Sequence, residues 1–118
     1  MTVPTASSTT VWEDVCPIED LVSGRGVAAL VGVGKVQVAI FLVDGELFAL
    51  SNFDPFSEAF VLSRGIVGSR GDRLKVASPV YKQSFDLRTG ECLDDAEVSV
   101  PVFAVRVVDG RVEVGSTG

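Results

Sequence analysis

The chain has 118 residues with a net charge of −6, from 16 acidic and 10 basic residues, and 47% of its residues are hydrophobic. Its scattered basic residues argue against nucleic acid or an anionic membrane as a partner, and no apolar run approaches the roughly 20 residues of a membrane span. Because the chain contains no histidine, Ser-His-Asp and Cys-His nucleophiles and all histidine-based zinc or iron sites are excluded.

The first ten residues, 1–10, have neither the basic start nor the apolar segment of a signal peptide. We therefore expect a flexible N-terminal tail and a cytoplasmic protein. Residues 11–118 are long enough for a single domain that buries a core without disulfide or metal staples. The two cysteines, Cys16 and Cys92, are far apart in sequence, so free thiols that are buried or half-buried are expected rather than a disulfide.

Strands dominate the rest of the chain, because apolar residues alternate with polar ones and long stretches of helical period are missing. Two tight hairpin turns are predicted, at Asp44-Gly45 and Asp109-Gly110, since both central positions of such turns favour positive φ. A third hairpin is predicted through Arg88-Thr89-Gly90. The predicted strands cover residues 11–15, 26–31, 35–43, 46–52, 83–87, 91–93, 101–108 and 111–115.

Individual positions follow from this pattern. Trp12 is predicted to point into the core from the first strand, and residues 16–21 are predicted to form a turn or one short helical turn. In the last hairpin, the alternating pattern predicts that four valines share one scheme of alternation, namely Val105, Val107, Val112 and Val114. The more solvent-exposed positions are predicted to hold Arg106, Arg111 and Glu113.

The pattern breaks between residues 52 and 75, where a proline, several glycines and mixed polarity predict a loop with one short helical turn at 58–62. No fixed-period repeat and no linker divide the chain. The layout predicts an all-β fold, an antiparallel sandwich or small barrel with two loop excursions at one end.

The two loops contain a recognisable pattern. The first reads SNFDPFS, residues 51–57, and the second reads ASPVYKQSFDLRTG, residues 77–90. The chain resembles the Rieske iron–sulfur domain over about residues 11–115. That family has a first loop of form Asn-x-Cys-Pro-x-His or the shorter Cys-Pro-His, a second loop of form Cys-Pro-x-His-Gly, and a Phe-Asp hairpin that ends in Thr-Gly.

The resemblance fails at the four cluster ligands. Asp54 and Phe56 occupy the first cysteine and histidine positions, and Ser78 and Tyr81 occupy the second pair. A Rieske cluster takes two thiolates on one iron and two imidazoles on the other. The sequence therefore predicts no metal, no cofactor and no catalytic residue in this chain.

One branch of the Rieske-like group lacks the ligands in this way, namely the small subunits of NADH-dependent assimilatory nitrite reductases. Residues 52–72, 76–95 and 98–114 are similar to that family. The resemblance implies an accessory role in nitrate assimilation, within an oxidoreductase complex of the cytoplasm. It also implies a partner, a large catalytic subunit that carries FAD, a [4Fe–4S] cluster and sirohaem and reduces nitrite to ammonia with electrons from NADH or NADPH.

Without a cluster, side chains must hold the two loops. We expect four residues to pack across the space that a cluster would fill: Phe53, Phe56, Val80 and Tyr81. Tyr81 is also expected to hydrogen-bond Asp54 or Ser78. Lys82 and Gln83 replace the glycine region of the second loop and are expected to be exposed. The predicted contact surface for the large subunit consists of Phe53, Phe56, Val80, Tyr81, Lys82 and Gln83.

Several alternatives stay open. The domain can instead be a Rieske-type, ferredoxin-like electron carrier, a ligand-less scaffold subunit of another oxidoreductase complex, or a free-standing enzyme that uses the loop pocket. Asp54 and Ser78 are candidates for a catalytic acid and a nucleophile, but a serine without a base is inert. A redox-active or proton-donating role for the Tyr81 phenol is a separate alternative. Phe53 and Phe56 fit a core as well as a contact. Partner contact and plain solubility explain Arg64, Arg70 and Arg73 equally well.

Overall fold

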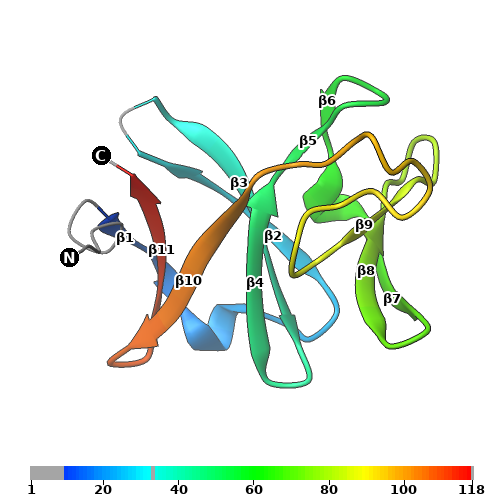
Figure 1. Cartoon of the computed structure of the whole chain (residues 1–118). Helices are drawn as coiled ribbons and strands as arrows, with labels where there is room; N and C mark the ends of the chain where they lie inside the picture. The colour runs from blue at the N-terminus through cyan, green and yellow to red at the C-terminus, as the bar shows by residue number, and fades with distance from the viewer. Residues whose placement is uncertain (1–9, 33, 118) are drawn as a thin grey trace, which may run out of the picture.

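The computed structural model describes residues 10–32 and 34–117. Over these residues the fold is all-β, as the sequence predicts, and its main feature is a six-stranded antiparallel sheet (Figure 1). The strand order is β1-β11-β10-β4-β3-β2. The strands are β1 (Thr10–Pro17), β2 (Gly26–Val31), β3 (Val36–Val43), β4 (Glu46–Ser51), β10 (Val102–Val108) and β11 (Arg111–Thr117).

A second group of short elements lies beside this sheet. It contains the hairpin of β5 (Phe53–Asp54) and β6 (Ala59–Phe60), and a three-stranded sheet of β7 (Ile66–Arg70), β8 (Arg73–Ala77) and β9 (Ser84–Asp86). Two 3-10 helices are present in the described residues, η1 (Ile18–Asp20) and η2 (Leu62–Arg64). Neither helix is long enough or apolar enough to cross a membrane.

The prediction of a loop over residues 52–75 is therefore wrong. Half of this segment is paired as strands, and its helical turn is η2, which begins four residues later than predicted. The β7–β8 register runs from Ile66 opposite Ala77 to Arg70 opposite Arg73. Local sequence did not indicate these strands because they are stabilised by pairing with each other, by the pairing of β8 with β9 and by the buried Val76, rather than by intrinsic propensity.

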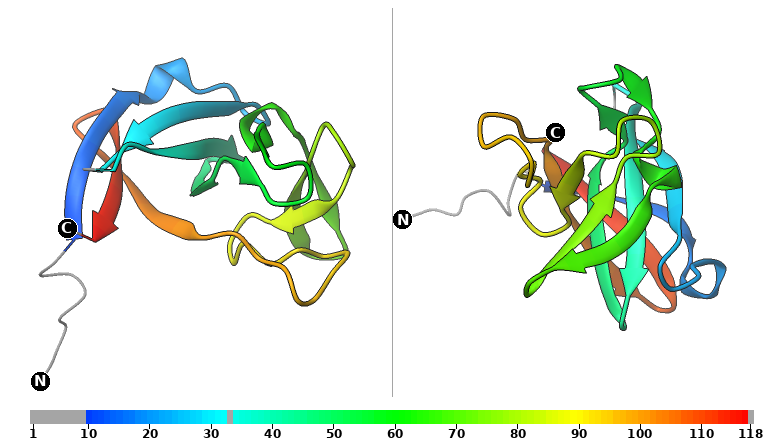
Figure 2. Two further views of the ribbon diagram at one scale, coloured as in Figure 1. Left: turned by 90° about the horizontal axis from the view of Figure 1, so that it is seen from above. Right: turned by 90° about the vertical axis from the view of Figure 1, so that its right-hand side faces the viewer.

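The large sheet curves strongly, as the view from above in Figure 2 shows. Its edges are β1 and β2, which are not paired with each other as strands. The backbone N–H of Gly32, just after β2, donates a 2.5 Å hydrogen bond to Glu13 Oε1 on β1. This side-chain contact links the two edges, so the sheet approaches a closed barrel.

Two hydrophobic clusters lie on opposite faces of the central strands. Val38 and Ile40 of β3 belong to the cluster inside the curved sheet, while Ala39 and Phe41 belong to the cluster beneath the short strands. All four are fully buried. Burial on both faces explains why this strand reads as a nearly continuous apolar run, without the alternation of a half-exposed strand.

The hairpin turns are confirmed. Asp44 and Gly45 have φ of 50° and 81°, and Asp109 and Gly110 have φ of 51° and 77°. In the last hairpin Val105 lies opposite Val114 and Val107 opposite Val112. Val112 and Val114 are buried, but Val107 is 46% exposed because it lies near the open turn.

Three further predictions concern the N-terminal part and the cysteines. Trp12 is only half-buried, and the Arg106 guanidinium lies 3.9 Å from its ring centroid, so this tryptophan is covered by an arginine and is not an inward anchor. The predicted tail, 1–10, lies outside the described residues except Thr10, which begins β1. Cys16 is half-buried and Cys92 buried, and both are free, as predicted.

Candidate functional site

Asn52, which follows β4, fastens the base of the first loop. It is almost fully buried, and its Nδ2 donates to Gln37 Oε1 at 3.2 Å. Its Oδ1 accepts a 2.6 Å hydrogen bond from the backbone N–H of Ser63 in η2. The asparagine therefore holds both ends of the excursion together. Sequence reasoning assigned it no role, although it occupies the asparagine position of the family pattern.

Ser78 organises the second loop. Its backbone N–H donates to Gln83 O at 2.9 Å, and its carbonyl accepts from Lys82 N–H at 3.1 Å. Its hydroxyl oxygen also accepts a 3.2 Å bond from Val80 N–H. Lys82 has φ of 70°, a left-handed conformation that favours glycine. The loop thus keeps the backbone shape of a glycine position while carrying a lysine.

The two loops meet at Asp54 and Ser78, which are both fully buried. The hydroxyl of Ser78 donates a 2.5 Å hydrogen bond to Asp54 Oδ2. The same carboxylate accepts from Ser57 Oγ at 2.8 Å and from Phe56 N–H at 2.9 Å. Burial raises the pKa of Asp54, but these hydrogen bonds together lower it by more than burial raises it. The net pKa therefore lies below its usual value. The carboxylate is therefore ionised at neutral pH.

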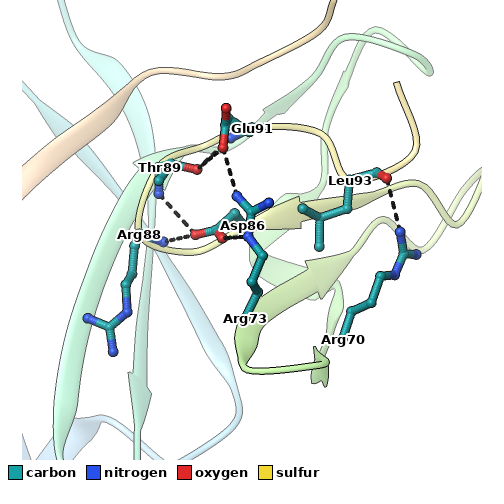
Figure 3. Close-up of polar contacts among 7 residues, drawn as sticks. All are labelled: Arg70, Arg73, Asp86, Arg88, Thr89, Glu91 and Leu93. Carbon is teal, nitrogen blue, oxygen red and sulfur yellow. Dashed lines mark hydrogen bonds and ion pairs between the residues drawn. The ribbon is translucent and has the colours of Figure 1, made fainter. Parts of the chain in front are cut away.

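Asp86 has the corresponding role in the hairpin after the second loop (Figure 3). Its Oδ1 accepts hydrogen bonds from the backbone N–H groups of Arg88, at 2.7 Å, and Thr89, at 3.1 Å. Its Oδ2 accepts a 2.6 Å bond from Arg73 Nε. Burial raises the pKa of Asp86, whereas the bonds from Arg73 and from the two backbone groups lower it, and the net pKa is lowered.

Ion pairs extend this network across the small sheet. Arg73 also pairs with Glu91 at 2.7 Å, and Arg70 donates to the carbonyl of Leu93 at 3.0 Å (Figure 3). Arg70 pairs in addition with Asp94 at 3.1 Å. These arginines, whose role the sequence left open between partner contact and solubility, thus tie the β7–β8 hairpin to the segment after β9.

The remaining motif residues of the hairpin are also explained by packing. Phe85 is fully buried in the core beneath the short strands. Gly90 has φ of 79°, and a Cβ there would lie 2.0 Å from the carbonyl oxygen of Val100. The Phe-Asp and Thr-Gly pairs therefore have structural functions, namely core packing, a capped turn and a close backbone approach. None of these functions needs a metal.

The predicted packing of the loop residues is only partly correct. Phe56 does pack against Phe85, with ring centroids 6.1 Å apart, while Phe53 packs against Phe60 of its own hairpin at 5.1 Å. Val80 and Tyr81 do not pack across the space between the loops, since they are 45% and 60% exposed. The contact between the loops is instead made by Asp54 and Ser78, which are buried and hydrogen-bonded to each other.

The predicted hydrogen bond from Tyr81 to Asp54 or Ser78 is likewise absent from the described residues, and Ser78 donates to Asp54 instead. Lys82 is exposed as predicted, but Gln83 is half-buried, with a buried side-chain oxygen. Phe60, which the sequence analysis did not single out, is 51% exposed on β6, opposite Phe53. Its signal was an apolar residue inside a stretch that was predicted to be a loop.

The donor set at the four ligand positions does not fit a [2Fe–2S] cluster. A Rieske cluster takes two thiolates and two imidazoles, whereas this chain offers a carboxylate, a phenyl ring, a hydroxyl and a phenol. The carboxylate and the hydroxyl are moreover bonded to each other. Residues 10–32 and 34–117 contain no group of three or more histidine, cysteine, aspartate or glutamate side chains that is able to hold a metal ion.

The chain is similar to known proteins over most of its length. Residues 11–115 match the family model described as a Rieske-like [2Fe-2S] domain. The nitrite reductase (NADH) small subunit of Salmonella typhimurium is 47% identical over 105 residues, which are 87% of this chain and 95% of that protein. The NMR structure of the Escherichia coli protein NirD is 42% identical and superposes with a TM-score of 0.83, covering 92% of this chain and 99% of that one.

A third relative has a different architecture. The nitrite reductase [NAD(P)H] large subunit of Klebsiella oxytoca contains a region that is 38% identical to this chain over 105 residues, which are 89% of this chain but only 11% of that protein. The match to the family model and the identity to full-length small subunits agree with the fold described above. The chain therefore belongs to the family of nitrite reductase (NADH) small subunits, which is built on the Rieske-like domain.

Proposed function

We propose that this chain is the cofactor-free accessory subunit of an assimilatory NAD(P)H-dependent nitrite reductase in the cytoplasm. In this role it docks on the large subunit, which holds the redox cofactors and reduces nitrite to ammonia. The main support is the buried Asp54–Ser78 hydrogen bond at the positions of the cluster cysteines. A domain that braces its loops in this way offers no thiolate or imidazole to a [2Fe–2S] cluster at these positions, and without histidine its serine has no imidazole base, so it contributes by binding.

The fused arrangement in the Klebsiella oxytoca large subunit supports the partnership. There a region similar to this chain is part of one polypeptide with the rest of a nitrite reductase. Covalent linkage raises the effective concentration of one part near the other, which is useful when the two parts act together. A separate small subunit would reach the same arrangement by non-covalent docking.

We place the docking surface at the loop end. Its centre is a loop-end patch of three exposed apolar side chains, Phe60, Val80 and Tyr81. Such exposure is unfavourable for a free monomer and typical of interface centres, where aromatic residues are enriched. Phe53 packs against Phe60, Phe56 packs on Phe85 in the core, and Lys82 and Gln83 follow Tyr81 in the second loop. This surface contains all six residues that the sequence predicted for partner contact.

The test is a titration of the purified large subunit with this chain, followed by assay of NADH oxidation that depends on nitrite. The double variant Val80→Ala/Tyr81→Ala should raise the Kd of the complex at least about tenfold, since buried aromatic anchors contribute most of the binding energy in interfaces. Val107→Ala is the matched control, because Val107 is 46% exposed on β10, near the turn at Asp109-Gly110.

Equal weakening by the control would show that the effect is not local to the loop end. An unchanged Kd and turnover in the double variant would reject the loop-end patch. Failure of the wild-type chain to bind the large subunit would reject the proposed function itself.

A further inference from the structure

Five of the seven arginines pair with carboxylates of this chain. The pairs are Arg70–Asp94, Arg73–Asp86, Arg88–Glu46, Arg106–Glu113 and Arg111–Asp14. Arg25 and Arg64 are the exceptions, since neither forms an ion pair within residues 10–32 and 34–117. These two arginines are therefore exposed positive charges without an acidic partner in the described residues, in a chain of net charge −6.

These two arginines line the same pocket, although they are 39 positions apart in sequence. The pocket has a volume of about 320 Å³ and lies where the start of β2 meets η2. Both arginines are exposed, and no acidic residue lines the pocket. The lining residues are Gly24, Arg25, Gly26, Ser63, Arg64 and Gly65.

Close backbone packing fixes the two walls relative to each other. A Cβ on Gly26 would lie 2.3 Å from the carbonyl oxygen of Ser63, and a Cβ on Gly65 would lie 2.4 Å from that of Ala77. A side chain at Gly26 would therefore separate β2 from η2, and a side chain at Gly65 would separate the end of η2 from β8. Gly26 thus keeps the segments that carry Arg25 and Arg64 in contact, and the close approach at Gly65 fixes the end of η2 against β8.

The pocket is also connected to the first loop. The backbone N–H of Ser63 donates to Asn52 Oδ1 at 2.6 Å, and Leu62 N–H donates to the Asn52 carbonyl at 3.1 Å. The asparagine that fastens the first loop thus positions η2 and its arginine. A partner that covers the loop end would reach this pocket along the same excursion.

We propose that the Arg25–Arg64 pocket receives an acidic segment of the large subunit, through ion pairs with its carboxylates. The proposal rests on the proposed function and adds the chemistry of the partner surface. Guanidinium groups bind carboxylates through two parallel hydrogen bonds, and within this chain Arg88 binds Glu46 in this way. Elsewhere the net negative charge of the chain repels acidic segments, so this pocket selects both the site and the orientation of docking.

The experiment measures the Kd of the complex with the large subunit at low and high salt. Arg25→Glu and Arg64→Glu should each raise the Kd at least about tenfold at low salt and flatten its dependence on salt. Arg25→Gln and Arg64→Gln should give smaller changes in the same direction. Lys35→Glu is the matched control, because it makes the same charge change at an exposed lysine that does not line the pocket and should leave the Kd within about twofold.

The outcomes separate this proposal from the proposed function. If the complex forms and all four arginine variants bind like the wild type, the pocket proposal is wrong and the accessory role stands. Equal weakening by Lys35→Glu also overturns it, since the effect would then be general charge repulsion. Binding of inorganic phosphate to the isolated chain is measured in parallel. If the arginine variants lose phosphate binding but leave the Kd of the complex unchanged, the pocket is a small-anion site and the proposal is wrong. If the wild-type chain does not bind the large subunit, both proposals fail.

Discussion

Ser78 Oγ donates a 2.5 Å hydrogen bond to Asp54 Oδ2 across 24 residues of sequence, and both residues are fully buried. In the Rieske pattern these positions belong to the two cysteines of the cluster. In this chain they are in direct contact, and Asp54 also accepts hydrogen bonds from Ser57 and Phe56. The two loops are therefore held by hydrogen bonds to one buried carboxylate.

The first prediction concerns the strength of this contact. Ser78→Ala should destabilise the fold by about 1–3 kcal/mol, and Asp54→Ala should cost more because it leaves several donors without an acceptor. The double variant should be less destabilised than the sum, with a coupling of about 1.5–3 kcal/mol for a charge-assisted bond. Urea unfolding measures all three values.

The exposed pair Arg111–Asp14 is the control for this cycle, since its two side chains are each 48% exposed. Its coupling should be smaller, because solvent screens exposed ion pairs. Additive effects of the Asp54 and Ser78 variants would mean that the hydrogen bond does not brace the loops.

The second prediction is a loss of stability in acid. The pKa values of Asp54 and Asp86 are lowered in the folded state, so the unfolded chain binds more protons than the folded one once the pH falls towards about 4. The free energy of unfolding should therefore be constant near neutral pH and decrease as the pH falls through the folded pKa values. Urea midpoints measured between neutral pH and about pH 3 give this curve.

Asp54→Asn and Asp86→Asn should each start from a lower stability at neutral pH and lose less of it in acid, because the titrating carboxylate is gone. A curve with the wild-type slope in both variants would assign the acid sensitivity to other carboxylates.

The third prediction compares two glycines with similar backbone angles. Gly90 and Gly110 have φ of 79° and 77°, but only Gly90 faces a close neighbour, the carbonyl oxygen of Val100. Gly110→Ala should cost about 1–2 kcal/mol, the usual penalty for a left-handed residue with a Cβ. Gly90→Ala should cost about 3 kcal/mol or more, because the backbone must also move. Equal thermal shifts for the two variants would contradict the close approach.

The fourth prediction concerns the second loop, where Lys82 has φ of 70°. Lys82→Gly should raise the free energy of unfolding by up to about 1 kcal/mol, because relief of the left-handed strain exceeds the added freedom of the unfolded chain. Lys82→Ala is the control and should bring no gain, since alanine keeps the Cβ. Destabilisation by glycine would mean that the lysine side chain contributes contacts to the folded state.

The fifth prediction addresses the cofactor. The purified chain, both as isolated and after anaerobic incubation with iron and sulfide, should contain no stoichiometric iron and show no visible absorption band. The reason is the absence of thiolate and imidazole donors at the four ligand positions. A Rieske ferredoxin treated in the same way is the positive control. A coloured, reducible chain with stoichiometric iron would favour the electron-carrier alternative.

The sequence predicted those features that depend on neighbouring residues. The turns at Asp44-Gly45 and Asp109-Gly110 follow from local backbone preference, and the strands beside them follow from alternation. The strands β7 and β8 were missed, because their stability comes from β9 and the core rather than from their own composition.

The candidate site divides in the same way. The pattern of residues 51–57 and 77–90 located the two loops and their four altered ligand positions, and the absence of histidine excluded whole classes of chemistry. The pattern did not reveal that Ser78 rather than Tyr81 bonds Asp54. It also gave no basis for distinguishing Arg64 from Arg70 and Arg73, since all three lie in one glycine-containing segment.

By itself, then, the sequence determined the all-β class, the tight turns, the family and the chemical groups at the site. Only the tertiary structure decided which of these groups meet, for example that Arg70 and Arg73 have acidic partners while Arg25 and Arg64 share a pocket. The physical reason is that turn and strand preferences act between adjacent residues. Ion pairs and buried hydrogen bonds join residues far apart in sequence, so they are fixed only when the sheets pack together.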